Sequence, residues 1–273
     1  MKYILPILLT ITLLIIWACN EETAKPRAEW GYDYFPLEIG MVWNYEMDSI
    51  TFRPQVGGVL HDSVHLLVRE TLVDTLRDLE NKLWYRGERY DRYSDSLPWR
   101  FRQTFLLYRD RRKAIRREDN LEFVKMTFPV EQYKNWDGHV AFDENKPIEV
   151  AGESMIIYQG WDYVYEYVDE NETIHNRSYD SLCLINSVDS EIEIEEEHPD
   201  IEGQAVEAFN RRFAVEKYAR GIGLVYREME VMDRANCPLW FDHPDTLIEK
   251  SWCITPWNEA VDAGFIIRQW LVE

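Results

Sequence analysis

Four cysteines carry the most reactive side chains of the sequence, at positions 19, 183, 237 and 253. Cys19 ends an apolar run near the start of the chain, and the three thiols left after it cannot all pair with one another. In an exported protein Cys237 and Cys253 are spaced to close a short loop, and a disulfide there would add about 3 kcal/mol to stability. Cys183 lies in the apolar stretch LCLI, which predicts a small buried core residue.

The first residues have the order of features found in a secretory signal peptide. Lys2 supplies a positive charge, and residues 4–17 form an apolar run of about 14 residues, short for a bilayer span of ~20. Ala18-Cys19 resembles the bacterial lipobox, which has a small residue where this sequence has Trp17. These features predict a signal peptide at residues 1–18 and a lipid on Cys19. A buried N-terminal helix ending in an ordinary cysteine, and cleavage without a lipid, are the alternatives.

The polar residues that follow are typical of a tether. Residues 20–29 (NEETAKPRAE) have no apolar period, so we expect residues 19–31 to be a lipid anchor and flexible tether, and residues 32–273 to be a single β-rich domain. Each buried lipid CH₂ contributes roughly 0.8 kcal/mol, so several acyl chains would hold the protein on a membrane. Asn20-Glu21-Glu22 resembles the acidic patch that sends some Bacteroidota lipoproteins to the cell surface, although a solvated linker has the same composition. The predicted location is the outer membrane, on its periplasmic or its cell-surface side.

Motifs for catalysis or metal binding are missing from the sequence. It has no H-E-x-x-H, C-x-x-C or G-x-S-x-G and no phosphate-binding loop. His61 and His65 would stand about 13 Å apart on a strand, too far to share a metal ion. The acidic segment 189–202 lacks the spacing of a calcium loop and predicts a strand end that runs into a solvated loop. With 50 acidic residues, close carboxylate pairs are inevitable and identify nothing. We therefore expect no catalytic residue, no metal and no cofactor.

Aromatic side chains are numerous, with 11 Trp and 16 Tyr. Those in or near predicted strands and loops are Trp84, Tyr85, Tyr90, Tyr93, Trp99, Trp161, Tyr163, Tyr165, Trp252 and Trp257. Such side chains line clefts that stack sugar rings or hold a lipid tail. Large β-sheets also bury many aromatic residues in an ordinary core, and we favour this interpretation.

Strands must position these side chains, because apolar residues alternate through most of the chain. Strands are predicted at residues 41–47, 64–68, 82–93, 100–108, 121–128, 162–169, 181–188, 213–218, 224–232 and 265–272. Gly221-Ile222-Gly223 predicts a hairpin turn, and residues 256–263 a short helix. Roughly nine or ten long strands predict a mostly β fold: a strongly curved antiparallel sheet or open barrel (lipocalin-like or half-barrel) with few short helices. A plain sandwich with a filled core is the alternative.

The composition restricts what the protein binds. Hydrophobic residues make up 46% of the chain, enough to build a core. The net charge of −20 argues against nucleic acid, whose phosphates need Lys and Arg. It also argues against electrostatic adhesion to anionic lipid, so a membrane contact would depend on the lipid at Cys19.

Several stretches together resemble a known group of proteins. They are Tyr34-Phe35-Pro36-Leu37 with Gly40 and Trp43, residues 120–130 (NLEFVKMTFPV) followed by Trp136-Asp137-Gly138, residues 217–228 (KYARGIGLVYRE) and residues 264–273. In this order the chain resembles a family of uncharacterised Bacteroidota lipoproteins. The resemblance implies an exported protein with one compact body, and it implies no activity and no catalytic residues.

A tripeptide of Asp, then Ser or Thr, then an aliphatic residue recurs along the chain, where composition alone would give about one match. It resembles the O-glycosylation signal of exported Bacteroidota proteins. The predicted acceptors are Ser49, Ser63, Thr75, Ser96, Ser181 and Thr246. An attached sugar must face solvent. Asp-Ser and Asp-Thr at turns and strand edges are the alternative interpretation.

Together these features support several functional hypotheses. The first is a lipid-anchored envelope protein without catalytic activity, whose curved sheet binds an apolar or amphipathic ligand. A surface carbohydrate-binding lipoprotein, a structural partner in an envelope complex and a hydrolase with an unrecognised site are the alternatives. The predicted partners are a membrane, through the N-terminal lipid, and a small apolar or glycan ligand, with no nucleic acid.

Overall fold

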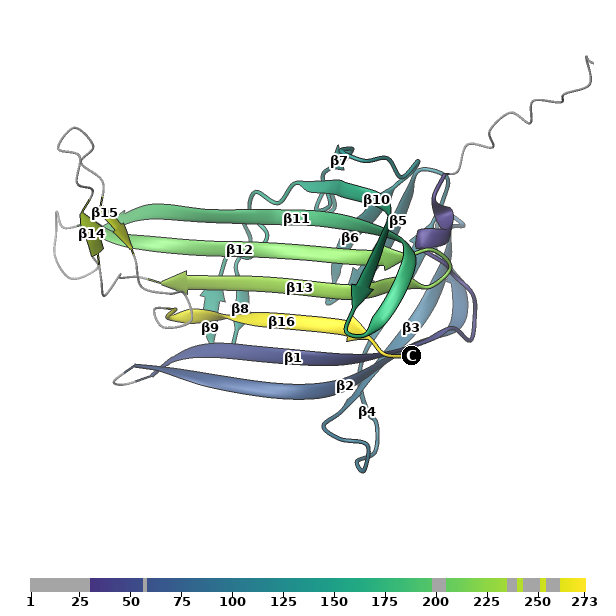
Figure 1. Cartoon of the computed structure of the whole chain (residues 1–273), viewed down its shortest axis with the longest axis horizontal. Helices are drawn as coiled ribbons and strands as arrows, with labels where there is room; N and C mark the ends of the chain where they lie inside the picture. Colours follow the sequence, from purple (N-terminus) through teal and green to yellow (C-terminus); the bar gives the residue numbers. More distant parts are fainter. Residues whose placement is uncertain (1–29, 56–57, 198–204, 235–239, 243–250, 254–260) are drawn as a thin grey trace, which may run out of the picture. The chain divides into compact units, whose positions relative to one another are not determined.

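The computed structural model describes residues 30–55, 58–197, 205–234, 240–242, 251–253 and 261–273 (Figure 1). The chain separates into two compact units, Met1–Trp30 and Gly31–Glu273, and every described strand belongs to the second unit. The predicted signal peptide and Cys19 lie outside the described residues. In the described part, no helix is both long enough and apolar enough to cross a membrane.

One antiparallel sheet of 12 strands dominates the second unit, in the order β6-β5-β4-β3-β2-β1-β16-β13-β12-β11-β10-β7. Its first half is β1 (Val42–Gln55), β2 (Gly58–Arg77), β3 (Leu83–Arg92), β4 (Arg100–Arg109), β5 (Lys113–Glu118) and β6 (Leu121–Thr127). Its second half is β7 (Asn135–Trp136), β10 (Tyr163–Ile174), β11 (Arg177–Glu197), β12 (Ala205–Ala219), β13 (Gly223–Arg234) and β16 (Ala263–Leu271). Two short hairpins are separate from it: β8 (Ile148–Val150) with β9 (Glu153–Met155), and β14 (Trp240–Asp242) with β15 (Ser251–Cys253).

The sheet consists of two meanders that meet at β1 and β16. Strands β1 to β6 follow one another outward on one side, and β10 to β13 return toward the middle on the other. β16 pairs with both β13 and β1, so the two ends of this unit are neighbouring strands. The mostly β fold with a strongly curved antiparallel sheet is confirmed.

Curvature brings the two edges of the sheet together, so that it is nearly closed. The backbone amide of Val124 in β6 donates to the carbonyl of Gly138 at 2.9 Å, and the Trp136 indole donates to the Val124 carbonyl at 2.8 Å. The Tyr165 hydroxyl accepts from the amide of Thr127 at 3.1 Å and donates to its carbonyl at 2.9 Å. An edge strand normally leaves such backbone groups unpaired, and here the opposite edge satisfies them.

Alternate residues of the strands build the interior. In β1 the side chains of Trp43, Tyr45 and Met47 are buried on one face, as their period of two predicts. The predicted hairpin is also confirmed, since β12 and β13 are joined through Gly221 and Gly223, whose φ angles of 71° and 96° favour glycine.

A short N-terminal segment packs against one end of the interior. It contains the 3-10 helix η1 (Tyr32–Tyr34), in which Tyr34 is fully buried. The Arg109 guanidinium donates to the carbonyls of Tyr32 and Phe35 at 2.6 and 2.7 Å. Arg220 pairs with Asp33 at 2.8 Å, which ties the segment to the end of β12.

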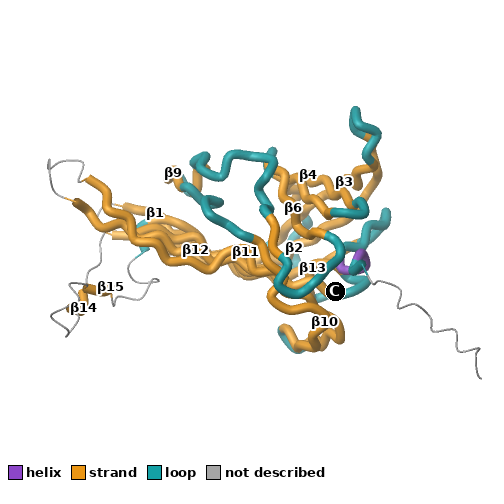
Figure 2. Tube along the Cα trace, turned by 90° about the horizontal axis from the view of Figure 1, so that it is seen from above, coloured by secondary structure: helices purple, strands orange, loops and turns teal. Residues whose placement is uncertain are grey.

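The central strands extend past the curled part of the sheet. β3 pairs with β2 only from Leu67 onward, and β10 pairs with β11 only up to Asn186. Beyond these points β2, β1, β16, β13, β12 and β11 continue as one layer, and Figure 2 shows β3, β4 and β6 turned away from it. β11 runs to Glu197, so the first part of the acidic segment is a strand, as predicted.

Two elements differ from the predicted set or lie beyond what the structure describes. The strand β5 was not predicted, because four of the six residues in KAIRRE are charged and hide its alternation. The helix predicted at 256–263 lies mostly outside the described residues, and Ala263 begins β16.

Candidate functional site

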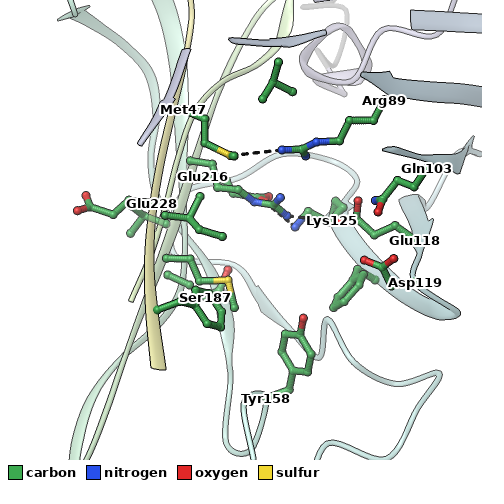
Figure 3. A pocket seen from close by; sticks show the side chains of 18 of the residues that line it. Met47, Arg89, Gln103, Glu118, Asp119, Lys125, Tyr158, Ser187, Glu216 and Glu228 are labelled. Atoms are coloured by element: carbon green, nitrogen blue, oxygen red, sulfur yellow. Dashed lines mark hydrogen bonds and ion pairs between the residues drawn. The ribbon is translucent and has the colours of Figure 1, made fainter. Parts of the chain in front are cut away.

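A cavity of about 360 Å³ lies inside the curled part of the sheet (Figure 3). Small-molecule sites in proteins have volumes of roughly 300–1,000 Å³, so the cavity is large enough for a small molecule. Its apolar lining includes Met47, Leu66, Val68, Met229, Phe265 and Ile267. On one side Phe123, Tyr158, Trp161 and Tyr163 form an aromatic wall. Its charged lining is Arg89, Asp91, Arg102, Glu118, Asp119, Lys125, Glu216, Arg227 and Glu228.

The aromatic wall is held in place by edge-to-face contacts. The ring centroid of Tyr158 lies 5.4 Å from that of Phe123 and 5.1 Å from that of Trp161. His139 packs behind this wall, and its Nε2 lies 3.0 Å from the Tyr163 hydroxyl. Burial, together with the charge of Lys125, lowers the pKa of His139 to about 4. The imidazole is therefore neutral at physiological pH.

Seven charged side chains form a continuous series of contacts across the interior, here termed the charge chain. Its members, in order, are Arg89, Glu70, Arg116, Glu118, Arg227, Glu216 and Lys125. They come from β2, β3, β5, β6, β12 and β13, so the chain connects strands of both halves of the sheet. Positive and negative groups alternate throughout.

The first half of the charge chain is centred on Glu70. Arg116 binds this carboxylate with two hydrogen bonds, of 2.7 and 2.9 Å, and Arg89 lies 3.3 Å from it. The Arg116 Nε donates to Glu118 at 2.8 Å. Glu70 is 3% exposed, so its charge depends on these partners rather than on water.

The second half is centred on Glu216. Its Oε1 lies 2.7 Å from the Lys125 amine and 2.9 Å from the Arg227 Nε, and its Oε2 accepts from the Tyr218 hydroxyl at 2.7 Å. Arg227 also approaches Glu118 at 3.7 Å, which joins the two halves. Figure 3 shows Lys125 and Glu216 toward the middle of the cavity, with Arg89 and Glu118 on one side.

The carboxylates of the charge chain are ionised. Burial alone would raise the pKa of Glu118, but Arg116 and Arg227 lower it to about 2. Burial likewise opposes ionisation of Glu216, and Lys125 and Arg227 lower its pKa to about 2. Since carboxylates with such low pKa values are weak bases, they are poorly suited to proton abstraction at neutral pH.

A second cavity of about 40 Å³ shares Lys125, Glu216 and Arg227 with the first. It is lined on another side by Phe35 and Pro36 of the N-terminal segment. The charge chain therefore borders both spaces, and the larger one is the candidate ligand site.

The aromatic residues singled out from the sequence are distributed between the cavity and other positions. Of these residues, Trp161 and Tyr163 line the cavity, and Trp84 and Tyr165 are buried in the core. Those that are neither in the lining nor fully buried are Tyr85, Tyr90, Tyr93 and Trp99. The side chain of Trp252, and all of Trp257, lie outside the described part.

The predicted acceptors for sugar are mostly on strands. Ser63 and Thr75 are exposed on β2, and Ser96 is exposed in the turn between β3 and β4. Ser49 on β1 and Ser181 on β11 are half-buried, and Thr246 lies outside the described residues. Glycosylation at these positions stays a prediction.

The cysteine and histidine residues singled out from the sequence lie outside the cavity lining or outside the described residues. Cys183 is a free thiol in the core, as predicted, and burial raises its pKa far above the ordinary value. Cys237 and the side chain of Cys253 lie outside the described part, so their disulfide stays a prediction. His61 and His65 are exposed on β2, where His65 contacts Asp48 at 2.8 Å. Within the described ranges, no three His, Cys, Asp or Glu side chains are grouped to hold a metal ion.

The charge chain was missed by the sequence analysis, although a signal for it exists. Glu70 continues the buried alternation of Leu66 and Val68, and Glu216 lies between the buried Ala214 and Tyr218. The signal is a charged residue at a position where the alternation of the strand predicts a core residue. It would have indicated the charge chain.

No protein-family model matches this chain, and no curated protein matches it.

Proposed function

We propose that this protein binds a small amphipathic ligand in the cavity of its curved sheet and is held in the outer membrane by a lipid on Cys19. The observation that carries the proposal is the cavity of about 360 Å³, in which an apolar wall, an aromatic wall and several charged groups converge. This combination is typical of sites that bury the apolar part of a ligand and orient it with a few polar groups.

The state of the charged groups favours binding over catalysis. Glu118 and Glu216 are each engaged by two cations, and the Lys125 amine donates to Glu216. A general base must have a pKa near the working pH, and a nucleophile must be free to attack. Glu118, Glu216 and Lys125 are instead bound in ion pairs with other members of the charge chain, as in a rigid preformed site.

Filling part of the cavity should weaken ligand binding. Ala214 is buried on β12 opposite Met229 of β13, and both residues line the cavity. In Ala214→Phe the added ring occupies part of this space, so we expect the affinity for 1-decanol, a neutral chain of about the right size, to fall at least about tenfold. Isothermal titration calorimetry measures it.

The matched control is Ala141→Phe, at an exposed position that is not part of the cavity lining. Its affinity should equal that of the parent, and both variants should unfold cooperatively on heating. Unchanged binding by folded Ala214→Phe, or a parent that binds neither 1-decanol nor a ten-carbon amphiphile with a charged head group, would count against the proposed function.

The anchor is tested separately, through its thiol. We expect cells fed labelled palmitate to incorporate label into the parent and not into Cys19→Ala, and we expect the variant to leave the membrane fraction. The net charge of −20 gives the body no electrostatic attraction to anionic lipid, so loss of the acyl chains should be sufficient. Equal fractionation of the two proteins would contradict this part of the proposal.

A further inference from the structure

The charge chain has a positive group at each end. Its four cations are Arg89, Arg116, Arg227 and Lys125, and its three carboxylates are Glu70, Glu118 and Glu216. The alternation therefore leaves one positive charge in excess within the charge chain. A buried charge without a counter-charge is costly, because it has lost its hydration.

Both ends of the charge chain face the cavity. Arg89 and Lys125 line it, and Figure 3 shows the two side chains reaching into the same space. The remaining contacts of Arg89 are neutral: Met47 Sδ at 3.4 Å and Gln269 Oε1 at 3.2 Å. Lys125 otherwise lies over the ring of Phe123 at 5.7 Å. Among the described residues, each end has one carboxylate partner.

The other carboxylates around the cavity do not supply the missing charge. Asp91 is shared by Arg100 and Arg102, at 2.9 and 2.5 Å. Glu228 is bound by Arg268 at 2.5 Å. Asp119 is an exposed residue, and among the described residues it forms no ion pair with Arg89 or Lys125. The positive ends therefore remain available to a ligand.

We infer that the ligand is a small amphipathic monocarboxylate whose carboxylate binds Arg89 and Lys125, while its apolar part lies against the aromatic and apolar walls. This inference rests on the proposed function and specifies its ligand class. One negative charge brings the buried groups to neutrality and extends the alternation to both ends of the charge chain. A phosphate monoester carries close to two negative charges near neutral pH and would overcompensate. Charge-assisted hydrogen bonds to a carboxylate are about twice as strong as neutral ones, which favours the acid over its alcohol.

The test compares three probes that differ in their head group: decanoate, 1-decanol and decyl phosphate. The full chain carrying Cys19→Ala is used, so that no detergent competes for the cavity. By isothermal titration calorimetry we expect decanoate to bind at least about tenfold more tightly than 1-decanol, and more tightly than decyl phosphate.

Arg89→Gln should remove this preference. Glu70 keeps its two hydrogen bonds to Arg116 in the variant, so the protein should still fold. We expect decanoate binding to weaken about tenfold while 1-decanol binding changes less than about twofold. Arg86→Gln is the matched control, because Arg86 is on the same strand and pairs with Asp74 at 2.9 Å away from the cavity. It should leave all three affinities unchanged.

The outcomes separate the two proposals. If 1-decanol binds and decanoate binds no more tightly, or decyl phosphate binds most tightly, the inference is overturned and the cavity remains a ligand site. If Arg89→Gln keeps the full preference for decanoate, the inference is also overturned. If none of the three probes binds, both proposals fail.

Discussion

Glu216→Gln is expected to lower the free energy of unfolding by about 3–5 kcal/mol. Glu216 is 4% exposed, and its carboxylate accepts hydrogen bonds from Lys125, Arg227 and the Tyr218 hydroxyl. Glutamine preserves the shape and one acceptor, but it leaves Lys125 without a carboxylate partner and raises the buried excess of positive charge by one. Removing one member of a buried ion pair costs far more than the net contribution of the pair, because the other member stays buried and uncompensated.

Glu172→Gln provides a control of the same chemistry at the surface. Glu172 also receives a lysine amine, from Lys217 at 2.5 Å, and a tyrosine hydroxyl, from Tyr167 at 2.5 Å. Its side chain is 34% exposed, so water replaces the lost contacts and we expect a loss below about 1 kcal/mol. Urea unfolding measured on both variants compares the two sites. Equal losses of unfolding free energy in the two variants would mean that burial does not increase the contribution of Glu216 to stability.

The double variant Glu216→Gln, Lys125→Met isolates the cause. If the penalty comes from an uncompensated Lys125, removing that charge as well should recover a large part of the stability lost by Glu216→Gln. If the penalty comes from lost packing, the losses of stability in the single variants Glu216→Gln and Lys125→Met should add in the double variant. The sign of the coupling energy therefore distinguishes electrostatics from shape.

The features of the fold and the site that could be predicted from the sequence are those that depend on residues close together in the chain. Alternation within a strand and a glycine turn are local signals, so the period of two predicted the interior face of β1, and Gly221 and Gly223 predicted the hairpin of β12 and β13. The charge chain is not local: Lys125 and Glu216 are 91 residues apart and meet only because the sheet nearly closes. Register and curvature decide that contact, and neither can be read from one strand.

Trp161 and Tyr163 of the aromatic wall were among the aromatic residues singled out from the sequence, but Phe123 and Tyr158 were missed for a similar reason. Tyr158 and Trp161 belong to the connection that leads to β10, and Phe123 belongs to β6 at the opposite edge of the sheet. Their composition is that of an ordinary β core, and it is the seam between the two edges that brings them into one wall. Sequence analysis could therefore predict the kind of side chain in the site, but not which of them would meet.

Stability is expected to fall as the pH is lowered from about 6.5, in two stages that have different origins. The first stage comes from His139, whose pKa is about 4 in the folded protein against an ordinary 6.5. Between these values the unfolded chain binds a proton that the folded protein does not, so the free energy of unfolding decreases toward acid by up to about 3 kcal/mol.

The second stage comes from Glu118 and Glu216, whose pKa values of about 2 lie below the ordinary 4.5. Their contribution is complete above pH 4.5 and is lost as the pH falls toward 2, by up to about 3 kcal/mol for each carboxylate.

Two variants assign the stages, with the free energy of unfolding measured by urea denaturation at intervals from pH 7.5 to 2.5. His139→Phe keeps an aromatic ring among its neighbours but has no proton to bind, so its stability should stay level between pH 6.5 and 4.5 and then fall as the parent does. His61→Gln, which changes an exposed histidine on β2, should keep the two-stage profile of the parent. A first stage that survives in His139→Phe would mean that the buried imidazole is not its source. A parent whose stability rises between pH 4.5 and 2.5 would contradict the ionised state of the charge chain, since paired carboxylates can only lose stability when they are protonated.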